Sequence, residues 1–115
     1  MLVPEQYIRM VGNGADPSVI DDTDAERFAV SMVGATARLE YKLRGARLHL
    51  LHTEVPEAFR GQGVGGRLVE AALAKARAEH LTIVPWCPYA REWLKQHPDR
   101  ITDVTLDFKT RPPKQ

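Results

Sequence analysis

Four glycines and one arginine fall within seven residues of this chain, immediately before a segment that has the pattern of a helix. Glycines leave the backbone N–H groups of a loop unshielded, and the start of a helix carries a partial positive charge. Together these features favour the binding of phosphate groups. The loop consists of Arg60, Gly61, Gln62, Gly63, Val64, Gly65 and Gly66.

Two common phosphate-binding patterns do not fit this loop. A Walker A loop requires a lysine and then a hydroxyl residue after its last glycine, whereas Gly66 is followed by Arg67. The dinucleotide pattern G-x-G-x-x-G fits Gly61, Gly63 and Gly66 but requires an acidic residue about 20 positions further on. The strand expected over residues 82–86 carries no acidic residue.

A third pattern, R/Q-x-x-G-x-G/A, is met by Arg60, Gly63 and Gly65 and is the pyrophosphate loop of the GCN5-related N-acetyltransferases. Four further motifs resemble the small single-domain subfamily of these enzymes, and with the loop they span residues 48–98. In chain order they are His52-Thr53-Glu54-Val55-Pro56, then Leu68 to Leu73, Val84-Pro85 with Cys87-Pro88, and His97-Pro98.

The resemblance implies that acetyl-CoA is the cosubstrate. Its pyrophosphate is expected on the backbone of the loop, and its pantetheine arm beside the strand that ends at Glu54 and Val55. Arg60 is expected to contact phosphate oxygens, although a solvated loop residue is the alternative. The expected coenzyme-binding residues are Val55, Arg60, Gly61, Gln62, Gly63, Val64, Gly65, Gly66 and Cys87.

His52 and Glu54 are the first candidates for proton transfer. They stand two residues apart on an expected strand, so their side chains point to the same face. Either could take a proton from the ammonium group of an acceptor. The alternative is structural, with Glu54 in a local ion pair and His52 hydrogen-bonded within the sheet.

Cys87 stands between an expected strand and the start of an expected helix, where the helix dipole favours a thiolate. The residue could lie beside the thioester or form a transient acyl-cysteine. It could also be a small buried hydrophobic residue. We expect a position near the thioester together with direct attack by the amine.

The proton donor for the departing thiolate is a second open point. Many members of the family place a tyrosine on the helix after this strand, where the present chain has Trp93. An indole N–H donates hydrogen bonds but does not release a proton in practice. Tyr89, one turn earlier, is the candidate replacement, and packing of its ring is the alternative.

The segments that must position these residues read as an α/β domain over residues 25–108. Alternation and turn signals predict an antiparallel meander of strands at residues 28–33, 35–43 and 46–55. Apolar residues at helical spacing predict a helix from Gly65 to the region of His80, which crosses over to a parallel strand.

The remaining segments follow from proline positions and from composition. The expected elements are a loosely ordered lead-in at residues 1–24, a strand at 81–84, a helix at 89–97, a strand at 101–108 and a tail at 109–115. The expected fold is thus a single acetyltransferase-like domain with a central mixed sheet and flanking helices. The resemblance adds that the two parallel strands splay around the cofactor.

Composition restricts the partners. The 115 residues fit one domain, and 16 basic against 15 acidic residues give a net charge of +1, which argues against nucleic acid or a membrane as the main partner. A single cysteine excludes an internal disulfide and a multi-cysteine zinc site, and no metal is expected. A monomer is expected, with a dimer as the alternative, in the cytoplasm because no signal-peptide pattern opens the chain.

These features predict an acetyl-CoA-dependent N-acetyltransferase that transfers acetyl to a primary amine. The alternative is a non-catalytic module that binds or senses acyl-CoA, which Trp93 in place of the usual tyrosine favours. His52, Glu54 and Cys87 favour the enzyme. The acceptor is open among small amines, polyamines, peptide N-termini and lysine side chains.

Overall fold

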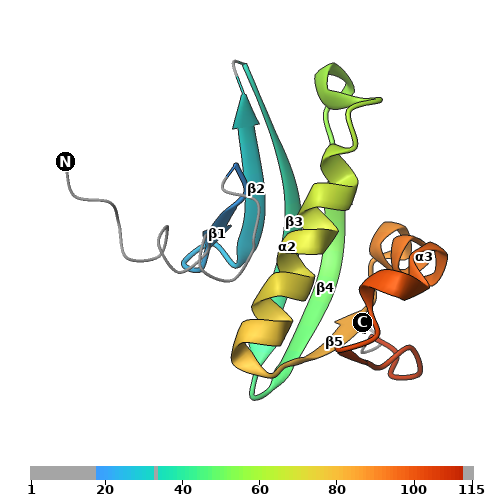
Figure 1. Cartoon of the computed structure of the whole chain (residues 1–115). Helices are drawn as coiled ribbons and strands as arrows, with labels where there is room; N and C mark the ends of the chain where they lie inside the picture. Colours follow the sequence, from blue (N-terminus) through green and yellow to red (C-terminus); the bar gives the residue numbers. More distant parts are fainter. Residues whose placement is uncertain (1–17, 33, 113–115) are drawn as a thin grey trace.

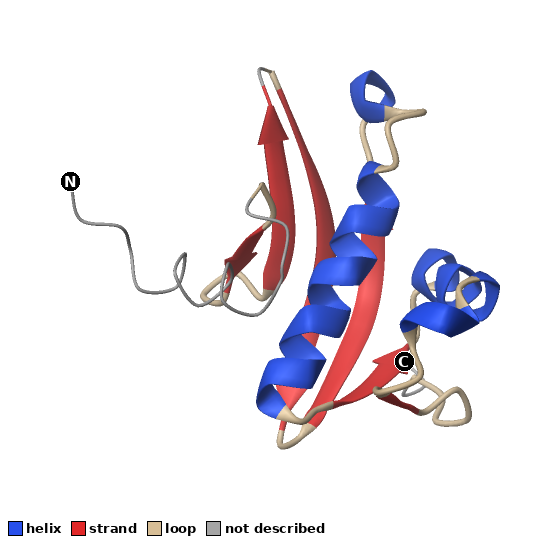
Figure 2. Cartoon of the chain, viewed as in Figure 1, coloured by secondary structure: helices blue, strands red, loops and turns tan. Residues whose placement is uncertain are grey.

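The computed structural model describes residues 18–32 and 34–112, and within them one mixed sheet organises the chain (Figures 1 and 2). Its strands lie side by side in chain order from β1 to β6. The strands are β1 Ile20–Asp22, β2 Arg27–Met32, β3 Ala35–Arg44, β4 Arg47–Glu54, β5 Thr82–Pro85 and β6 Thr105–Leu106. The helices are α2 Val64–Glu79 and α3 Pro88–Gln96, with 3₁₀ turns η1 Glu57–Phe59 and η2 Pro98–Arg100.

The antiparallel meander is confirmed by β2, β3 and β4, which pair in antiparallel register. Gly45 closes the turn between β3 and β4 at φ 60°, a left-handed conformation that suits glycine. Alternation along β3 buries Leu39 and Tyr41 on one face of the sheet and leaves Arg38 and Glu40 half-buried on the other. The sheet therefore has one apolar face and one charged face.

Helix α2 covers the apolar face (Figure 1). It packs against β2, β3, β4 and β5, and its fully buried side chains Leu68 and Leu73 join the core with Leu48 and Leu50 of β4. Burial of each such side chain contributes roughly 2 kcal/mol, so this interface supplies much of the stability of the domain. The helix ends at His80, whose left-handed conformation at φ 57° turns the chain into β5.

Strand β5 runs parallel to β4, as the helical crossover predicts, and the two strands separate after four residue pairs. The last pair is Leu50 with Pro85, after which the Cys87 amide donates to the Leu50 carbonyl at 2.8 Å. From His52 to Glu54, β4 pairs only with β3. The splayed parallel strands are thus present in the structure.

A β-bulge lies at the level where the strands separate. Glu40 pairs with His52 and Tyr41 pairs with Leu50, which leaves Leu51 as an extra residue in β4. A bulge of this kind bends its strand and increases the local twist. The bend accounts for the divergence of β4 from β5.

The C-terminal strand is shorter than the predicted strand at residues 101–108. The turn η2 occupies Pro98–Arg100, and β6 pairs with β5 only through Thr105 and Leu106. Asp107 then ends the strand, because its carboxylate accepts hydrogen bonds from the amides of Lys109 and Thr110 and folds the chain back. A hydrogen bond from the Thr110 hydroxyl at 2.6 Å, these amide bonds and the nearby Arg47 hold the pKa of Asp107 well below its usual range.

The first described residues lie within the segment predicted as a lead-in, of which residues 1–17 fall outside the described part. Val19 is fully buried there, and β1 pairs with β2. The carboxylate of Asp21 accepts a hydrogen bond from the Tyr41 hydroxyl at 2.5 Å and one from Lys75 Nζ at 2.7 Å. Asp21 therefore connects β1 to both β3 and α2.

Burial and charge around this contact act on the two donors. Burial raises the pKa of Tyr41, and its hydrogen bond to Asp21 raises it further. Burial lowers the pKa of Lys75, but the contacts with Asp21 and Glu79 outweigh this effect and the pKa is raised. Both donors therefore keep their protons at neutral pH.

We expect Asp21→Ala to lower the free energy of unfolding by about 3 kcal/mol, because it leaves the ammonium group of Lys75, whose side chain is only 10% exposed, without its main partner. The matched control is Asp103→Ala, which removes an ion pair of Arg77 with a carboxylate that is 62% exposed. The control is expected to cost less than about 1 kcal/mol. Urea unfolding followed by circular dichroism measures both, and equal losses would contradict the role given to Asp21.

Candidate functional site

The glycine-rich loop leads from η1 into α2. Phe59 of η1 is buried and fixes the start of the loop, whereas Arg60, Gly61, Gln62 and Gly63 are exposed. Gly61 and Gly63 have φ values of 80° and 69°, and no atom lies within 4 Å of the position that a Cβ would take at either residue. These two glycines permit the turn and leave open space over the backbone.

The first turn of α2 presents free backbone donors. The first helical hydrogen bond at this end runs from the Arg67 amide to the Gly63 carbonyl at 3.1 Å. The amides of Val64, Gly65 and Gly66 precede it and have no carbonyl one turn back. No residue in the described ranges accepts a hydrogen bond from them. Free donors, the helix dipole and open space over Gly61 and Gly63 together suit an anionic ligand.

Gly65 and Gly66 serve a different purpose from Gly61 and Gly63. A Cβ at Gly65 would lie 2.5 Å from the Tyr89 hydroxyl oxygen, and one at Gly66 would lie 2.8 Å from Trp93 Nε1. These two glycines therefore allow α3 to pack closely against the first turn of α2. Sequence reasoning grouped all four glycines as one phosphate loop and did not separate these roles.

Cys87 lies where the two parallel strands separate. It occupies the N-cap position of α3 without a capping hydrogen bond from its side chain, and the residue is 2% exposed. Its Sγ lies 3.1 Å from the Thr53 hydroxyl oxygen. This hydrogen bond bridges the end of β4 and the start of α3. Sequence reasoning identified Cys87 but missed Thr53, because hydroxyl residues in strands are common and the contact spans 34 positions.

Tyr89 is a half-exposed phenol at the start of α3, 46% exposed. Burial raises its pKa above the usual value, and the nearby Cys87 raises it further. The hydroxyl thus keeps its proton at neutral pH and can donate. Trp93, one turn later, stacks on the His97 ring at a centroid distance of 4.0 Å and has its indole nitrogen against Gly66.

His52 and Glu54 lie together on the charged face of the sheet. His52 Nε2 is 3.6 Å from a Glu54 carboxylate oxygen, and both side chains are more than half exposed. The same Glu54 oxygen accepts a hydrogen bond from Arg38 Nη2 at 2.9 Å. The ion pair that sequence reasoning held as the structural alternative for Glu54 is therefore present, beside a histidine that can accept a proton.

The remaining expected coenzyme contacts are distributed around the loop. Val64 is the buried first residue of α2, and Val55 packs at the edge of the core directly after β4. Gln62 donates from its side chain to the Ala58 carbonyl at 3.2 Å, which braces the loop. The exposed guanidinium of Arg60 makes no hydrogen bond or ion pair with a described residue.

Two general features of the described residues complete the picture. No helix among them is long and apolar enough to cross a membrane. Within the same ranges, no group of three or more His, Cys, Asp or Glu side chains is placed to hold a metal ion.

Comparison with known proteins agrees with this arrangement. Residues 27–104 match the protein family described as GCN5-related N-acetyl-transferase. The chain belongs to this family. The sequence motifs predicted three parts of this family's fold that the structure contains. These are the loop after β4, the helix that follows the loop, and the separation of β4 from β5.

Relatives in vertebrates share most of the chain. Protein NATD1 of Gallus gallus is 34% identical over 92 residues, which cover 77% of this chain and 84% of the relative. Protein NATD1 of Homo sapiens is 35% identical over 88 residues, with 74% and 78% covered, and that of Xenopus tropicalis is 36% identical over 90 residues, with 72% and 83% covered.

The close packing at Gly65 yields a test by double substitution. Gly65→Ala is expected to destabilise the protein by about 1 kcal/mol, because the new Cβ overlaps the outer end of the Tyr89 ring, which is half exposed and must shift. Tyr89→Ala should relieve this overlap, which gives a favourable coupling energy of about 1 kcal/mol between the two substitutions.

Gly63→Ala provides the control for that cycle. Its cost arises from the positive φ of 69°, with open space around the new Cβ, so it should not couple to Tyr89→Ala. Thermal unfolding of the single and double variants measures the coupling. A coupling as large for Gly63 as for Gly65 would show that Tyr89 does not pack on Gly65.

Proposed function

We propose that the protein transfers the acetyl group of acetyl-CoA to a primary amine. The observation that carries this proposal is that a helix start with free backbone amides lies close to a pair of parallel strands that separate. The two features are joined through α3, which contacts the first turn of α2 through Tyr89 and contacts the end of β4 through Cys87.

The residues present fit the coenzyme. The free amides of Val64, Gly65 and Gly66 and the open space over Gly61 and Gly63 match a pyrophosphate. Arg60 supplies a cation with no partner among the described residues, and a guanidinium can hold two phosphate oxygens. The free edge of β4 from Leu51 onward offers backbone groups to the amides of the pantetheine arm.

The bound coenzyme supplies an activated acyl group as a thioester. The amine nitrogen bonds to the thioester carbonyl carbon, the carbon–sulfur bond breaks, and the thiolate takes a proton. The side chains of His52 and Glu54 can accept the proton that the acceptor ammonium must lose before attack. Tyr89, whose pKa is raised, can donate the proton that the thiolate needs. Tyr89 then regains a proton from the nitrogen of the new amide, which loses its second proton as the amide forms.

A non-catalytic acyl-CoA-binding module is the second candidate. The observation that favours it is Trp93, which is stacked on His97 and packed against Gly66. Trp93 is thus a structural residue at the position where the family resemblance implied a proton-donating tyrosine. Coenzyme release in the presence of an amine separates the candidates, because both bind acetyl-CoA and only the enzyme turns it over.

Acetyl-CoA is expected to raise the melting temperature. At a concentration of about 100 times its dissociation constant, a ligand that binds only the native state adds about 2.7 kcal/mol, or roughly 10 °C for a domain of this size. Gly63→Val should abolish the shift, because its side chain occupies the open space over the loop.

Gly45→Val is the matched control for this experiment. Gly45 has φ 60° and open space around it, much like Gly63 at 69°, but it lies in the turn between β3 and β4. The variant should be strained to a similar extent and should keep the full shift with acetyl-CoA. Loss of the shift in both variants, or in neither, would count against a phosphate site at the loop.

Cys87→Ser tests direct attack against an acyl-cysteine route. The substitution keeps the hydrogen bond to Thr53 possible and removes the thiol, so direct transfer should lose less than about tenfold in kcat. Intact-mass measurement of the wild type with acetyl-CoA alone should show no added acetyl group. Stoichiometric labelling of Cys87 that an amine then discharges at the turnover rate would establish the covalent route instead.

A further inference from the structure

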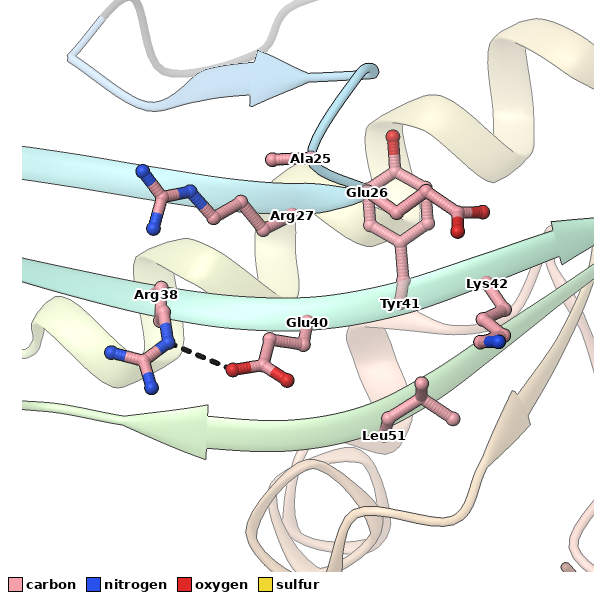
Figure 3. A pocket seen from close by; sticks show the side chains of 8 residues that line it. All are labelled: Ala25, Glu26, Arg27, Arg38, Glu40, Tyr41, Lys42 and Leu51. Carbon is pink, nitrogen blue, oxygen red and sulfur yellow. Dashed lines mark hydrogen bonds and ion pairs between the residues drawn. The ribbon is translucent and has the colours of Figure 1, made fainter.

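The face of the sheet opposite α2 contains a hollow of about 290 Å³ beside the bulge of β4 (Figure 3). Its lining combines residues from the turn before β2 with side chains from three strands. Arg27 comes from β2, Arg38, Glu40 and Lys42 come from β3, and Leu51 is the extra residue of the bulge. The hollow therefore lies next to the point where β4 leaves β5.

The acidic residues of the hollow are already paired. Glu26 accepts a hydrogen bond from Arg44 Nη1 at 3.0 Å, and Glu40 accepts one from Arg38 Nε at 2.8 Å. The Arg44 contact is the main reason why the pKa of Glu26 is lowered. Glu26 thus remains ionised at neutral pH, and both carboxylates have cations in contact.

Two of the basic residues are not paired in this way. The Arg27 guanidinium has its nearest ion-pair contact at 3.8 Å, from Nε to an Asp22 oxygen, which is beyond hydrogen-bonding distance. Arg27 Nε is buried without a hydrogen bond. The ammonium group of Lys42 makes no ion pair or hydrogen bond with any residue in the described ranges, and Lys42 pairs only through its backbone, with His49. The lining thus contains three basic side chains, Arg27, Arg38 and Lys42, and two acidic ones, Glu26 and Glu40. The hydrogen-bond donors that remain without an acceptor belong to Arg27 and Lys42.

The orientation of Arg27 and Arg38 indicates where in the hollow an anion would bind. In Figure 3 the guanidinium groups of Arg27 and Arg38 extend along the sheet toward the end of β4, which carries Glu54. Arg38 uses Nε for Glu40 and Nη2 for Glu54, and Arg27 lies on the neighbouring strand. An anion bound by these two guanidinium groups would lie on the same face of the sheet as His52 and Glu54.

We propose that this hollow binds the carboxylate of the acceptor, so that the acetylated substrate is an amine that also carries an acid group several bonds away. This inference rests on the proposed acetyl transfer. The excess of one positive charge matches one carboxylate, and Glu26, Glu40 and nearby Glu54 disfavour a doubly charged phosphate.

The spacing of the strands favours an acceptor whose amine lies several bonds away from its acid group. Arg27 on β2 and His52 on β4 lie in one transverse row, because both pair with Glu40. Two strand spacings separate them by roughly 10 Å between backbones. For an acid held by Arg27, this separation favours an acceptor in which a chain joins the amine to the acid, as in an ω-amino acid or an amino-acid side-chain amine.

The first experiment measures binding without turnover. The probe 6-aminohexanoate is titrated into the full chain, and backbone amide shifts of Arg27, Arg38 and Leu51 are followed by NMR. We expect saturable shifts, and a dissociation constant about tenfold to a hundredfold higher in Arg27→Gln, because a charged hydrogen-bond partner is lost. The dissociation constant of Arg27→Lys should lie between those of the wild type and Arg27→Gln, since lysine keeps the charge but lacks the planar guanidinium group with its paired donors.

The second experiment compares turnover of 6-aminohexanoate with that of pentylamine, which lacks only the carboxylate. We expect kcat/KM to be at least about tenfold higher for 6-aminohexanoate, and we expect Arg27→Gln to remove this preference without changing the rate with pentylamine. Arg100→Gln is the matched control, because Arg100 is an exposed arginine paired with Glu70 outside the hollow.

The outcomes separate this inference from the proposed function. Acetylation of both amines at equal rates, insensitive to Arg27→Gln, would support the transferase and overturn the acid-binding site. Saturable binding of 6-aminohexanoate that needs Arg27, with no acetylation of any amine, would support the site and overturn the transferase. Stronger binding of inorganic phosphate than of 6-aminohexanoate would overturn the assignment of a carboxylate.

Discussion

The separation of β4 from β5 after Leu50 is the constraint on which the rest of the structure depends. It results from a local event, the extra residue Leu51 in β4, and from one hydrogen bond, from the Cys87 amide to the Leu50 carbonyl. Because that bond ends the pairing, the backbone of β4 beyond it has no partner strand on this side, and Cys87 is held opposite Thr53. The same bulge places Leu51 in the wall of the charged hollow, so one irregularity shapes both faces of the site.

Much of this arrangement could be predicted because its causes are local in sequence. The meander follows from alternation and turn residues, α2 from apolar spacing, and the loop from Gly61 and Gly63, whose backbone conformation excludes most other residues. The bulge could also have been predicted from the local sequence. Alternation of polar and apolar residues runs through Leu48, His49 and Leu50 and is then broken by a second leucine, Leu51.

The parts that sequence reasoning missed depend on contacts between distant segments. Nothing near Gly65 in the sequence indicates that the ring of Tyr89 will cover it, and nothing near Thr53 indicates that Cys87 will be its partner. The sequence does not indicate that the basic residues line a hollow either, because a charged residue in a strand is usually exposed to solvent. Only the pairing of Glu26 and Glu40 with other arginines reveals that Arg27 has unused donors.

The glycines at the start of α2 have a further consequence for the energetics of the chain. Glycine is a poor helix former, at about 1 kcal/mol less favourable than alanine, and here two of them occupy the first turn. That turn is therefore the weakest part of the helix, and its order depends on the aromatic cover from α3 and on whatever occupies its free amides. Coenzyme affinity in this protein would thus contain a folding contribution. Deuterium uptake at the amides of Val64 to Arg67 would report how much of the binding free energy is spent on winding the helix.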